Sequence, residues 1–260
     1  MSRILITGSS KGLGRATALE LARRGHEVIA TARKVETLAD LPVAQRLSLD
    51  VTSEASVRRA VEQAGRVDVL INNAAEIAVA PLESIPFEEV RNLYDINVFG
   101  ALRMIQAVTP AMRERRAGTV VNISSVVGRV SLPLTGVYSS TKWALEALSE
   151  SLRLELGHFG VRVVLVEPGE IGTGALDAPR AYFGENDPYL PLKAERQFRP
   201  REKMTPPETI ARTIADAVEA PEQRFRWPAG ADAEALLALR AKLDDPAFDT
   251  ALRSAIKLQW

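Results

Sequence analysis

The chain contains no cysteine and only two histidines among its 260 residues. The absence of cysteine excludes disulfide bonds, thiolate nucleophiles and cysteine-ligated metals. Two histidines are also too few for a histidine-rich metal site. We therefore expect the function to involve no metal, and most classes of zinc enzyme are excluded.

The chain also lacks an excess of one charge and any long apolar run. Its 33 Lys and Arg balance 33 Asp and Glu, which argues against nucleic acid or an anionic membrane as the main partner. No apolar stretch approaches the roughly 20 residues that cross a bilayer. The run Ile4-Leu5-Ile6 is too short for the core of an export signal. We expect a cytoplasmic protein without a membrane span.

Short β-branched runs alternate with longer amphipathic stretches over the first two-thirds of the chain. The runs are nearly all apolar, which is typical of strands buried on both faces of a parallel sheet. The alternation predicts an α/β doubly wound parallel sheet in a single domain over residues 1–260. The predicted strands are Ile4–Thr7, Glu27–Ala32, Arg46–Asp50, Val67–Asn72, Thr119–Ser124 and Val161–Glu167, and the helices are Gly14–Arg24, Ser53–Ala64, Pro86–Arg116 and Tyr138–Gly157.

Residues 172–205 differ from the rest because they are rich in proline and carry little periodicity. Such a segment inside a compact domain is typical of a functional lid or a disordered stretch, and we interpret it as a substrate lid. Pro206 and Pro207 then suit the first turn of a helix that runs to Glu219. A last strand over Arg224–Trp227 and helices over Ala231–Leu243 and Pro246–Ile256 complete the prediction.

A glycine-rich turn, Thr7-Gly8-Ser9-Ser10-Lys11-Gly12-Leu13-Gly14, follows the first strand and leads into a helix. Glycine lets the chain reverse tightly and lets its backbone approach a pyrophosphate. The helix N-terminus then points unpaired N–H groups at the phosphates. The spacing is not that of a P-loop. The turn predicts a dinucleotide site with contacts from Gly8, Ser10, Lys11, Gly12, Leu13 and Gly14.

The end of the second strand indicates which dinucleotide binds. An enzyme for NAD usually places Asp or Glu there, to hold the ribose 2′-hydroxyl. This chain has Ala32-Arg33 instead, and Lys11 adds a second cation nearby. Because Arg binds phosphate well, we predict NADP(H) in preference to NAD(H). Asp50 and Val51 follow the third strand where the adenine edge would lie, although a helix-capping loop explains them nearly as well.

Tyr138 and Lys142 are four residues apart and so share one face of a predicted helix. Reducing a carbonyl requires a proton as well as a hydride, and a phenol with a pKa of about 10 is a poor acid–base group at neutral pH. A cation about 4 Å away is worth roughly 4 kcal/mol, or up to three pKa units. We therefore expect Lys142 to lower the pKa of Tyr138. Ser125, thirteen residues earlier, ends the fifth strand where its hydroxyl would meet a substrate oxygen.

Taken in order, these motifs resemble those of the short-chain dehydrogenase/reductase family, of the single-domain type. The likeness covers Ile4 to Gly230. Asn72-Asn73-Ala74-Ala75 stands for the family's Asn-Asn-Ala-Gly, with Ala75 in place of glycine. The residues around Tyr138 also resemble the retinol and 17β-hydroxysteroid dehydrogenase branch. The resemblance implies a three-layer, Rossmann-like sheet of about seven strands with the site at their carboxyl ends.

The resemblance also implies roles for individual residues. Tyr138 would be the proton donor or base, and Ser125 would position and polarise the carbonyl. Lys142 would bind the nicotinamide ribose and lower the pKa of the tyrosine, and Asn97 would hold a water that links Lys142 to solvent. Asn73 and Ala74, with Ala75 beside them, would line the adenosine ribose, and Pro168, Gly169, Ile171 and Thr173 would flank the nicotinamide.

The expected activity is NADP(H)-dependent interconversion of a carbonyl and an alcohol, in the direction of reduction. The expected substrate is a small apolar molecule, because the lid carries Leu176, Leu190 and Leu192 and the aromatics Tyr182, Phe183, Tyr189 and Phe198. The lid cations Arg180, Lys193 and Arg196 would select an acidic group or simply face solvent. Two alternatives stay open, a catalytically silent NADP(H)-binding sensor and a non-redox epimerase or dehydratase on the same fold.

The resemblance finally implies an oligomer. Helices Asn97–Arg116 and Tyr138–Gly157 would form the usual family dimer interface. We expect a homodimer or homotetramer.

Overall fold

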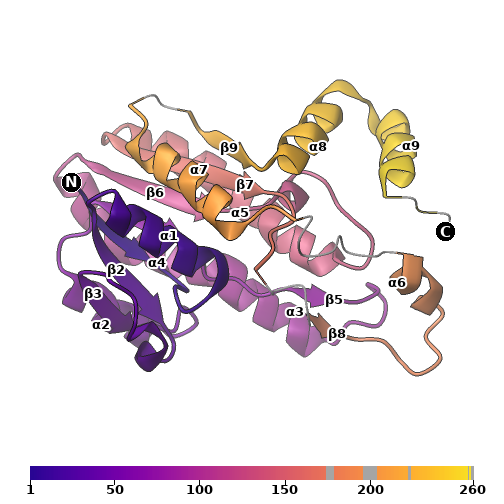
Figure 1. Cartoon of the computed structure of the whole chain (residues 1–260), viewed down its shortest axis with the longest axis horizontal. Coiled ribbons are helices and arrows are strands. Elements are labelled where there is room, and N and C mark those ends of the chain that lie inside the picture. Colours follow the sequence, from indigo (N-terminus) through magenta and orange to yellow (C-terminus); the bar gives the residue numbers. More distant parts are fainter. Residues whose placement is uncertain (174–178, 196–203, 222–223, 257, 259–260) are drawn as a thin grey trace.

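A computed structural model of the chain describes residues 1–173, 179–195, 204–221, 224–256 and 258. Its centre is a seven-stranded sheet in the order β3-β2-β1-β4-β6-β7-β9, and every neighbouring pair is parallel (Figure 1). The predicted doubly wound α/β sheet in a single domain is therefore confirmed. The strands are β1 (Arg3–Ile6), β2 (Glu27–Ala32), β3 (Gln45–Ser48), β4 (Val69–Asn72), β6 (Gly118–Ile123), β7 (Val161–Pro168) and β9 (Arg226–Ala229).

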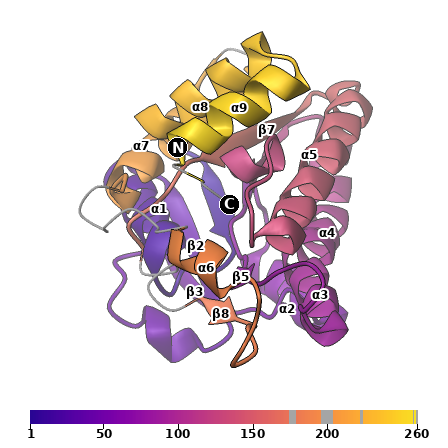
Figure 2. The ribbon, with the colours of Figure 1, turned by 90° about the vertical axis from the view of Figure 1, so that its right-hand side faces the viewer.

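Helices cover both faces of the sheet, and each face has its own apolar core. One core packs β-strand side chains against α2 (Glu54–Ala64), α4 (Gly100–Glu114) and the end of α5 (Gly136–Gly157). The other packs them against α1 (Gly12–Arg23) and α7 (Pro207–Glu219). Figure 2 shows these layers from the side, with α1 and α7 on one side of the strands and α4 and α5 on the other. The near-continuous apolar strands are explained by this double coverage.

The strand order reverses between β1 and β4. From β1 the chain proceeds outward to β2 and β3, and from β4 it proceeds the other way to β6, β7 and β9. Loops that leave neighbouring strands at such a point diverge to opposite faces, and the crevice between them is the usual place for a ligand in open α/β sheets. A ligand site is therefore expected between the loops after β1 and β4.

A buried chain of polar side chains connects the sheet to α5. Asn72 on β4 donates to Asn122 on β6 at 2.9 Å, and Asn122 donates to Ser149 on α5 at 2.8 Å. Ser149 in turn donates to the Leu145 carbonyl at 2.7 Å. Because unpaired polar groups are costly to bury, these bonds restrict how α5 can rotate or slide on the sheet. That restriction matters for the site, since α5 carries Tyr138 and Lys142.

The predicted helix over Pro86–Arg116 is wrong in detail. It divides into α3 (Phe87–Tyr94), a π-helical turn (Asp95–Phe99) and α4. The π turn inserts extra backbone without breaking the helix, and it buries Asn97. Hydropathy periodicity does not reveal such a turn, because the apolar pattern continues on both sides of it.

Several smaller features also differ from the prediction. The last strand lies two residues later than predicted, at β9. Residues 172–205 contain a short strand, β8 (Arg180–Ala181), and a helix, α6 (Leu190–Glu195). β8 pairs in parallel with β5 (Ala78–Val79) to form a second, two-stranded sheet. The last helices are α8 (Ala231–Lys242) and α9 (Asp245–Ala255).

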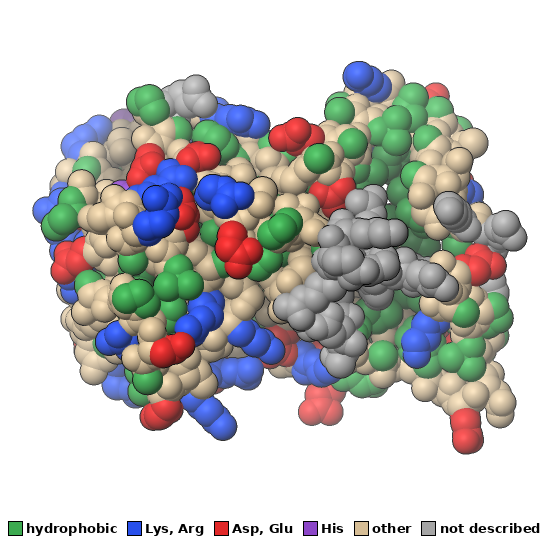
Figure 3. All heavy atoms as spheres, viewed as in Figure 1, with side chains coloured by type: hydrophobic (Ala, Val, Ile, Leu, Met, Phe, Trp, Pro, Cys, Tyr) green, Lys and Arg blue, Asp and Glu red, His purple; other side chains and the backbone are tan. Residues whose placement is uncertain are grey.

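The surface is mixed in charge. On the face shown in Figure 3, Lys and Arg side chains lie among Asp and Glu side chains and do not gather into one basic area. Within the described part of the chain, no helix has both the length and the hydropathy needed to cross a membrane.

The C-terminus of α7 depends on a half-buried arginine of β7. Arg162 donates to the carbonyls of Ala217 at 2.8 Å and Val218 at 3.2 Å, and also to the carbonyl of Ala220. These carbonyls have no partner further along the helix. Arg162 therefore stabilises the helix end and fixes α7 to the sheet.

We predict that Arg162→Met lowers the free energy of unfolding by about 1–3 kcal/mol, because the helix carbonyls lose charged hydrogen bonds. Urea denaturation followed by circular dichroism measures this. The control is Arg59→Met on the exposed face of α2, expected to change stability by less than about 0.5 kcal/mol. Equal effects in the two variants would contradict the role given to Arg162.

Candidate active site

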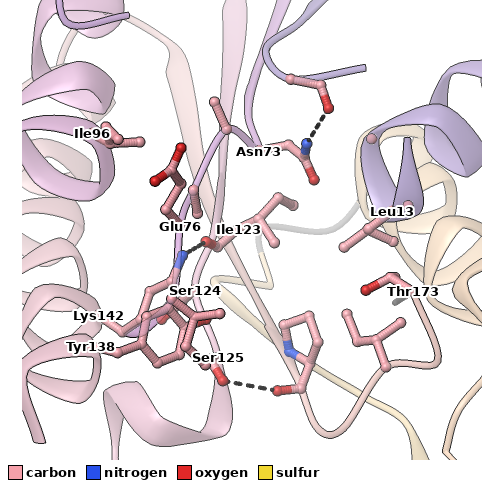
Figure 4. A pocket seen from close by; sticks show the side chains of 18 of the residues that line it. Leu13, Asn73, Glu76, Ile96, Ile123, Ser124, Ser125, Tyr138, Lys142 and Thr173 are labelled. Atoms are coloured by element: carbon pink, nitrogen blue, oxygen red, sulfur yellow. Dashed lines mark hydrogen bonds between the residues drawn. The ribbon is translucent and has the colours of Figure 1, made fainter. Parts of the chain in front are cut away.

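A cavity of about 790 Å³ opens at the carboxyl ends of the strands, at the reversal of strand order. It extends from the glycine-rich turn after β1 to the start of α5. Figure 4 shows Leu13 and Thr173 on one side and Tyr138, Lys142 and Ser125 on the other. All residues predicted to contact a cofactor line this cavity: Gly8, Ser10, Lys11, Gly12, Leu13, Gly14, Arg33, Asp50, Val51, Asn73, Ala74, Ala75, Tyr138, Lys142, Pro168, Gly169, Ile171 and Thr173.

The loops after β1 and β4 are joined by hydrogen bonds through Asn73. Its amide Nδ2 donates to the carbonyls of Thr7 at 2.9 Å and Gly8 at 3.1 Å. The Thr7 hydroxyl accepts the backbone N–H groups of Asn73 and Ala74, both at 2.9 Å. A Cβ on Gly14 would lie 2.3 Å from the Gly8 carbonyl oxygen and 2.4 Å from Asn73 Nδ2. Glycine at position 14 is thus required by close packing.

Gly8 and Gly12 have a different requirement. Their φ angles are +73° and +56°, a region that side chains other than glycine seldom adopt. These two residues turn the chain so that the N-terminus of α1 faces the cavity. The tight reversal of the chain that the sequence predicted for these glycines is therefore present in the structure.

Arg33, which follows β2, also lines the cavity, and an acidic residue lies next to it. Arg33 is 72% exposed on its side chain and lies 3.4 Å from Glu76, which also pairs with Arg180 of β8. Arg180 makes a second ion pair with Glu89 at 3.0 Å. The Arg180 side chain is exposed, as expected, and its charge is paired with two carboxylates of the chain itself. Its selection of an acidic group on a substrate stays a prediction. Glu76 is thus shared between Arg33 and Arg180, and the Arg33 side chain stays largely exposed at the cavity.

Asp50 lies between the cavity and the start of α2, and its contact with an adenine edge stays a prediction. It lines the cavity beside Val51, and its Oδ1 also accepts from the backbone N–H of Thr52 at 3.0 Å and the Thr52 hydroxyl at 2.7 Å. These bonds shape the turn that precedes α2.

Ser125, Tyr138 and Lys142 meet at the other end of the cavity. The Ser125 hydroxyl donates to the Pro168 carbonyl at 3.3 Å, and the Lys142 ammonium donates to the Ile123 carbonyl at 2.8 Å (Figure 4). Lys142 Nζ lies 5.8 Å from the centre of the Tyr138 ring. Lys142 is 3% exposed. The site thus brings a hydroxyl, a phenol and a buried ammonium together at one wall.

The electrostatics of this group differ from the expectation. Burial raises the pKa of Tyr138 to about 12, and contact with the Ser125 hydroxyl opposes this only in part. The Lys142 ammonium is directed to the Ile123 carbonyl, and burial is the largest influence on the pKa of the phenol. Burial also lowers the pKa of Lys142 to about 8, against the field of Glu146. Desolvation therefore outweighs the attraction between the two groups that the sequence spacing indicated.

Asn97 lies behind the cavity wall and does not line it. Its Oδ1 accepts from the backbone N–H of Glu76 at 2.8 Å, and its Nδ2 donates to the Glu76 carbonyl at 2.9 Å and the Thr141 hydroxyl at 3.1 Å. Asn97 therefore holds the loop after β4 against α5. Its implied role in binding a water stays a prediction.

The described part of residues 172–205 contributes less to the cavity than predicted. Leu192, Phe183 and Tyr189 pack on Val79 and Leu134 in a small cluster of their own. Thr173, Pro179 and Arg180 are the described residues of this region that line the cavity. Lys193 lies 4.4 Å from the centre of the Phe183 ring. Leu176, Arg196 and Phe198 lie outside the described residues.

Apolar side chains from elsewhere surround the catalytic end. Val126, Val127 and Leu132 line the cavity, and they pack with Tyr138 against Leu236 and Leu237 of α8. Sequence reasoning missed these residues, and it also missed Glu76. No local motif predicts this contact, because α8 lies about a hundred positions along the chain from Tyr138.

Comparison with known proteins identifies the family. Residues 2–181 match the family model described as short chain dehydrogenase. The chain is 36% identical to 17-beta-hydroxysteroid dehydrogenase type 1 of Homo sapiens, over 94% of this chain and 81% of that protein. It is 34% identical to retinol dehydrogenase 8 of Bos taurus, over 97% of this chain and 88% of that protein. The chain belongs to the short-chain dehydrogenase family and is an oxidoreductase.

The solved structures agree with this assignment. A short chain dehydrogenase from Burkholderia cenocepacia, crystallised in complex with NADP, superposes with a TM-score of 0.78 at 28% identity, over 98% of this chain and 97% of that one. The resemblance to the family, and to its retinol and 17β-hydroxysteroid branch, is confirmed.

We predict that Gly14→Ala destabilises the protein by about 1–3 kcal/mol, as overpacking does in a tight site, because the added methyl group displaces Asn73 or the Gly8 carbonyl. Thermal unfolding measures the change. The matched control is Gly157→Ala at the end of α5, where a Cβ would meet nothing within 4 Å. This control should be neutral or slightly stabilising. A neutral result for Gly14→Ala would show that the two loops adjust freely.

Proposed function

We propose that this protein is an NADP(H)-dependent carbonyl reductase that converts an apolar ketone or aldehyde to an alcohol. One observation supports the proposal above the others. Ser125, Tyr138 and Lys142 line the same cavity as the glycine-rich turn, so a proton-donating group and a dinucleotide cradle share one space.

The residues of the cavity fit a dinucleotide. Gly8 and Gly12 adopt positive φ and line the cavity at the N-terminus of α1, where backbone N–H groups would bind a pyrophosphate. Lys11 and Arg33 supply positive charge on the same cavity. A bound nicotinamide dinucleotide would supply or accept the hydride of the reaction.

The remaining chemistry belongs to the side chains. With a pKa near 12, the phenol of Tyr138 keeps its proton at neutral pH, which is the form needed to protonate a carbonyl oxygen. The Ser125 hydroxyl can donate a hydrogen bond to the same oxygen and polarise the carbonyl. The buried ammonium of Lys142 would bind ribose hydroxyls and stabilise negative charge that develops on the phenol oxygen.

The preference for NADP(H) rests on Arg33. β2 does not end in Asp or Glu. The carboxylate that pairs with Arg33, that of Glu76, also pairs with Arg180. Arg binds phosphate through parallel charge-assisted hydrogen bonds, so Arg33 favours a 2′-phosphate over a 2′-hydroxyl.

The apolar substrate is inferred from the side chains around Tyr138. Val127 and Leu132 line the cavity there, and Leu236 of α8 packs with them. The two named relatives are, by their names, dehydrogenases of a steroid and of retinol, which are apolar molecules. A sensor that has lost catalysis is disfavoured by the intact Ser125, Tyr138 and Lys142.

We also propose a homo-oligomer in the cytoplasm. Large apolar side chains are exposed along α5, with Trp143 at 46% and Leu154 at 76%. Such side chains suit an interface between copies of the chain.

We predict that the protein oxidises NADPH in the presence of retinal or a 17-ketosteroid, and that Tyr138→Phe lowers kcat by about 100-fold or more, since general acid catalysis is lost. The assay follows absorbance at the NADPH band across a panel of apolar ketones and aldehydes. The control is Tyr94→Phe, whose hydroxyl contacts Ser140 on the far side of α5. Undiminished turnover in Tyr138→Phe would refute the assignment of the proton donor.

We predict that Arg33→Ala weakens NADPH binding by about 10–100-fold, which corresponds to the loss of a charge-assisted hydrogen bond. NADH binding should change by less than about threefold in the same variant, because its ribose carries no phosphate. Isothermal titration calorimetry measures both constants. Lys34→Ala, one residue further along, controls for charge alone, and an equal loss for both cofactors in Arg33→Ala would argue against 2′-phosphate recognition.

A further inference from the structure

Two carboxyl side chains are buried behind the catalytic wall, outside the cavity. Glu146 on α5 is 4% exposed and Glu167 on β7 is 1% exposed. A Cβ on Gly128 would lie 2.7 Å from the Ser124 hydroxyl and 3.1 Å from Glu146 Cγ, so the packing around Glu146 is tight. The reaction proposed above assigns no task to either carboxyl group.

Arg226 distinguishes the two carboxyl groups. It donates to Glu146 Oε2 at 3.0 Å but lies 3.6 Å from Glu167, whose other cation, Arg129, is 3.7 Å away. Charge-assisted hydrogen bonds at the shorter distance favour the ionised form. Burial and the neighbouring Glu146 raise the pKa of Glu167 to about 7. Burial also raises the pKa of Glu146, and the Ser124 hydroxyl and Arg226 oppose that rise. Because Arg226 reaches Glu146 at hydrogen-bond distance and Glu167 does not, the negative charge of the pair is better stabilised on Glu146.

Glu146 lies one helical turn after Lys142, which itself lies one turn after Tyr138. Residues four apart on a helix are neighbours on one face, so the three side chains follow one line along α5. Lys142 is 3% exposed, and its ammonium makes its hydrogen bond to a neutral carbonyl, that of Ile123. Glu146 is the carboxylate whose field acts on the ammonium.

We propose that Glu146 is a positioning residue that keeps the Lys142 ammonium protonated at neutral pH. The inference rests on the proposed function, in which a charged Lys142 assists Tyr138. A buried amine favours its neutral form, and the carboxylate at the next turn of α5 offsets that preference without occupying the cavity.

The charges around Glu146 come from every element packed against it. Lys142 and Glu150 lie on α5, Arg226 on β9, Glu167 on β7 and Arg129 after the short helix over 126–128, while Ser124 contributes its hydroxyl. Burial lowers the pKa of Lys142 to about 8 and Glu146 opposes that fall. Removing the Glu146 charge therefore lowers the pKa of Lys142 further, and the ammonium loses its proton at a lower pH.

The direct test titrates Lys142 itself. The chain has seven lysines, so a protein labelled at the lysine Cε and Nζ gives few side-chain NMR signals, and Lys142→Met assigns the one of interest. In Glu146→Gln the pKa of Lys142 should fall by about one pH unit. Glu146→Asp, which keeps the charge, should restore most of the wild-type value.

A matched control is Glu150→Gln. Glu150 binds the same arginine at 2.6 Å but is 61% exposed on its side chain, and it lies two turns from Lys142, so the pKa of Lys142 should stay within about 0.3 units of wild type. If Glu146→Gln fails to fold, Glu146→Met removes the charge with an apolar side chain that suits the buried position. An unchanged Lys142 pKa in the folded charge-free variant overturns the proposal.

The pH dependence of turnover separates this proposal from the proposed function. With NADPH and an accepted carbonyl, the alkaline limb of kcat/KM should move down by about one pH unit in Glu146→Gln and not in Glu150→Gln. A shifted NMR titration with an unshifted limb supports the coupling of Glu146 to Lys142 and contradicts the assigned role of Lys142 in catalysis. A protein that turns over no carbonyl contradicts the proposed function, while the NMR titration still decides the proposal.

Discussion

The hydrogen bonds of Asn73 fix the geometry on which the rest of the site depends. They join the loop after β1 to the loop after β4 at the point where the strand order reverses. The chain continues from these loops to helices on opposite faces of the sheet, so the bonds join the two sides of the crevice. Gly14 allows the contact because a methyl group there would occupy the space of the Asn73 amide. The loops after β1 and β4 are therefore held together as one side of the cavity.

Burial has the largest influence on the chemistry at the other end of the cavity. It raises the pKa of Tyr138 to about 12 and lowers that of Lys142 to about 8. Both shifts favour neutral forms, and both groups lie at the same wall. Fixed partners in the wall therefore matter for the charge of these two groups. The Ile123 carbonyl and the Glu146 carboxylate are such partners for the ammonium.

Local motifs predicted the fold and the lining of the cavity, and contacts between distant residues were missed. The apolar strands, the glycine turn and the Tyr138–Lys142 spacing each lie within a single strand, helix or turn. A pattern of neighbouring residues therefore predicts them. The π turn around Asn97 was missed because it leaves hydropathy unchanged. The pairing of Arg180 with Glu76 and Glu89 depends on β8 lying beside β5, which no periodicity indicates. The pKa of Tyr138 depends on burial, which spacing does not give.

The charged groups behind Lys142 show how the fold accommodates an ammonium in its interior. Positive and negative groups alternate from Lys142 to Glu146 to Arg226, and Glu150 continues the series at the surface. Each buried charge thus lies next to one of opposite sign, as the large desolvation penalty of a lone ion requires. The series begins at the catalytic wall and ends in solvent. The ammonium is therefore held in the cavity wall by the Ile123 carbonyl of β6 and by the charge of Glu146 on α5, and Arg226 of β9 balances Glu146 in turn.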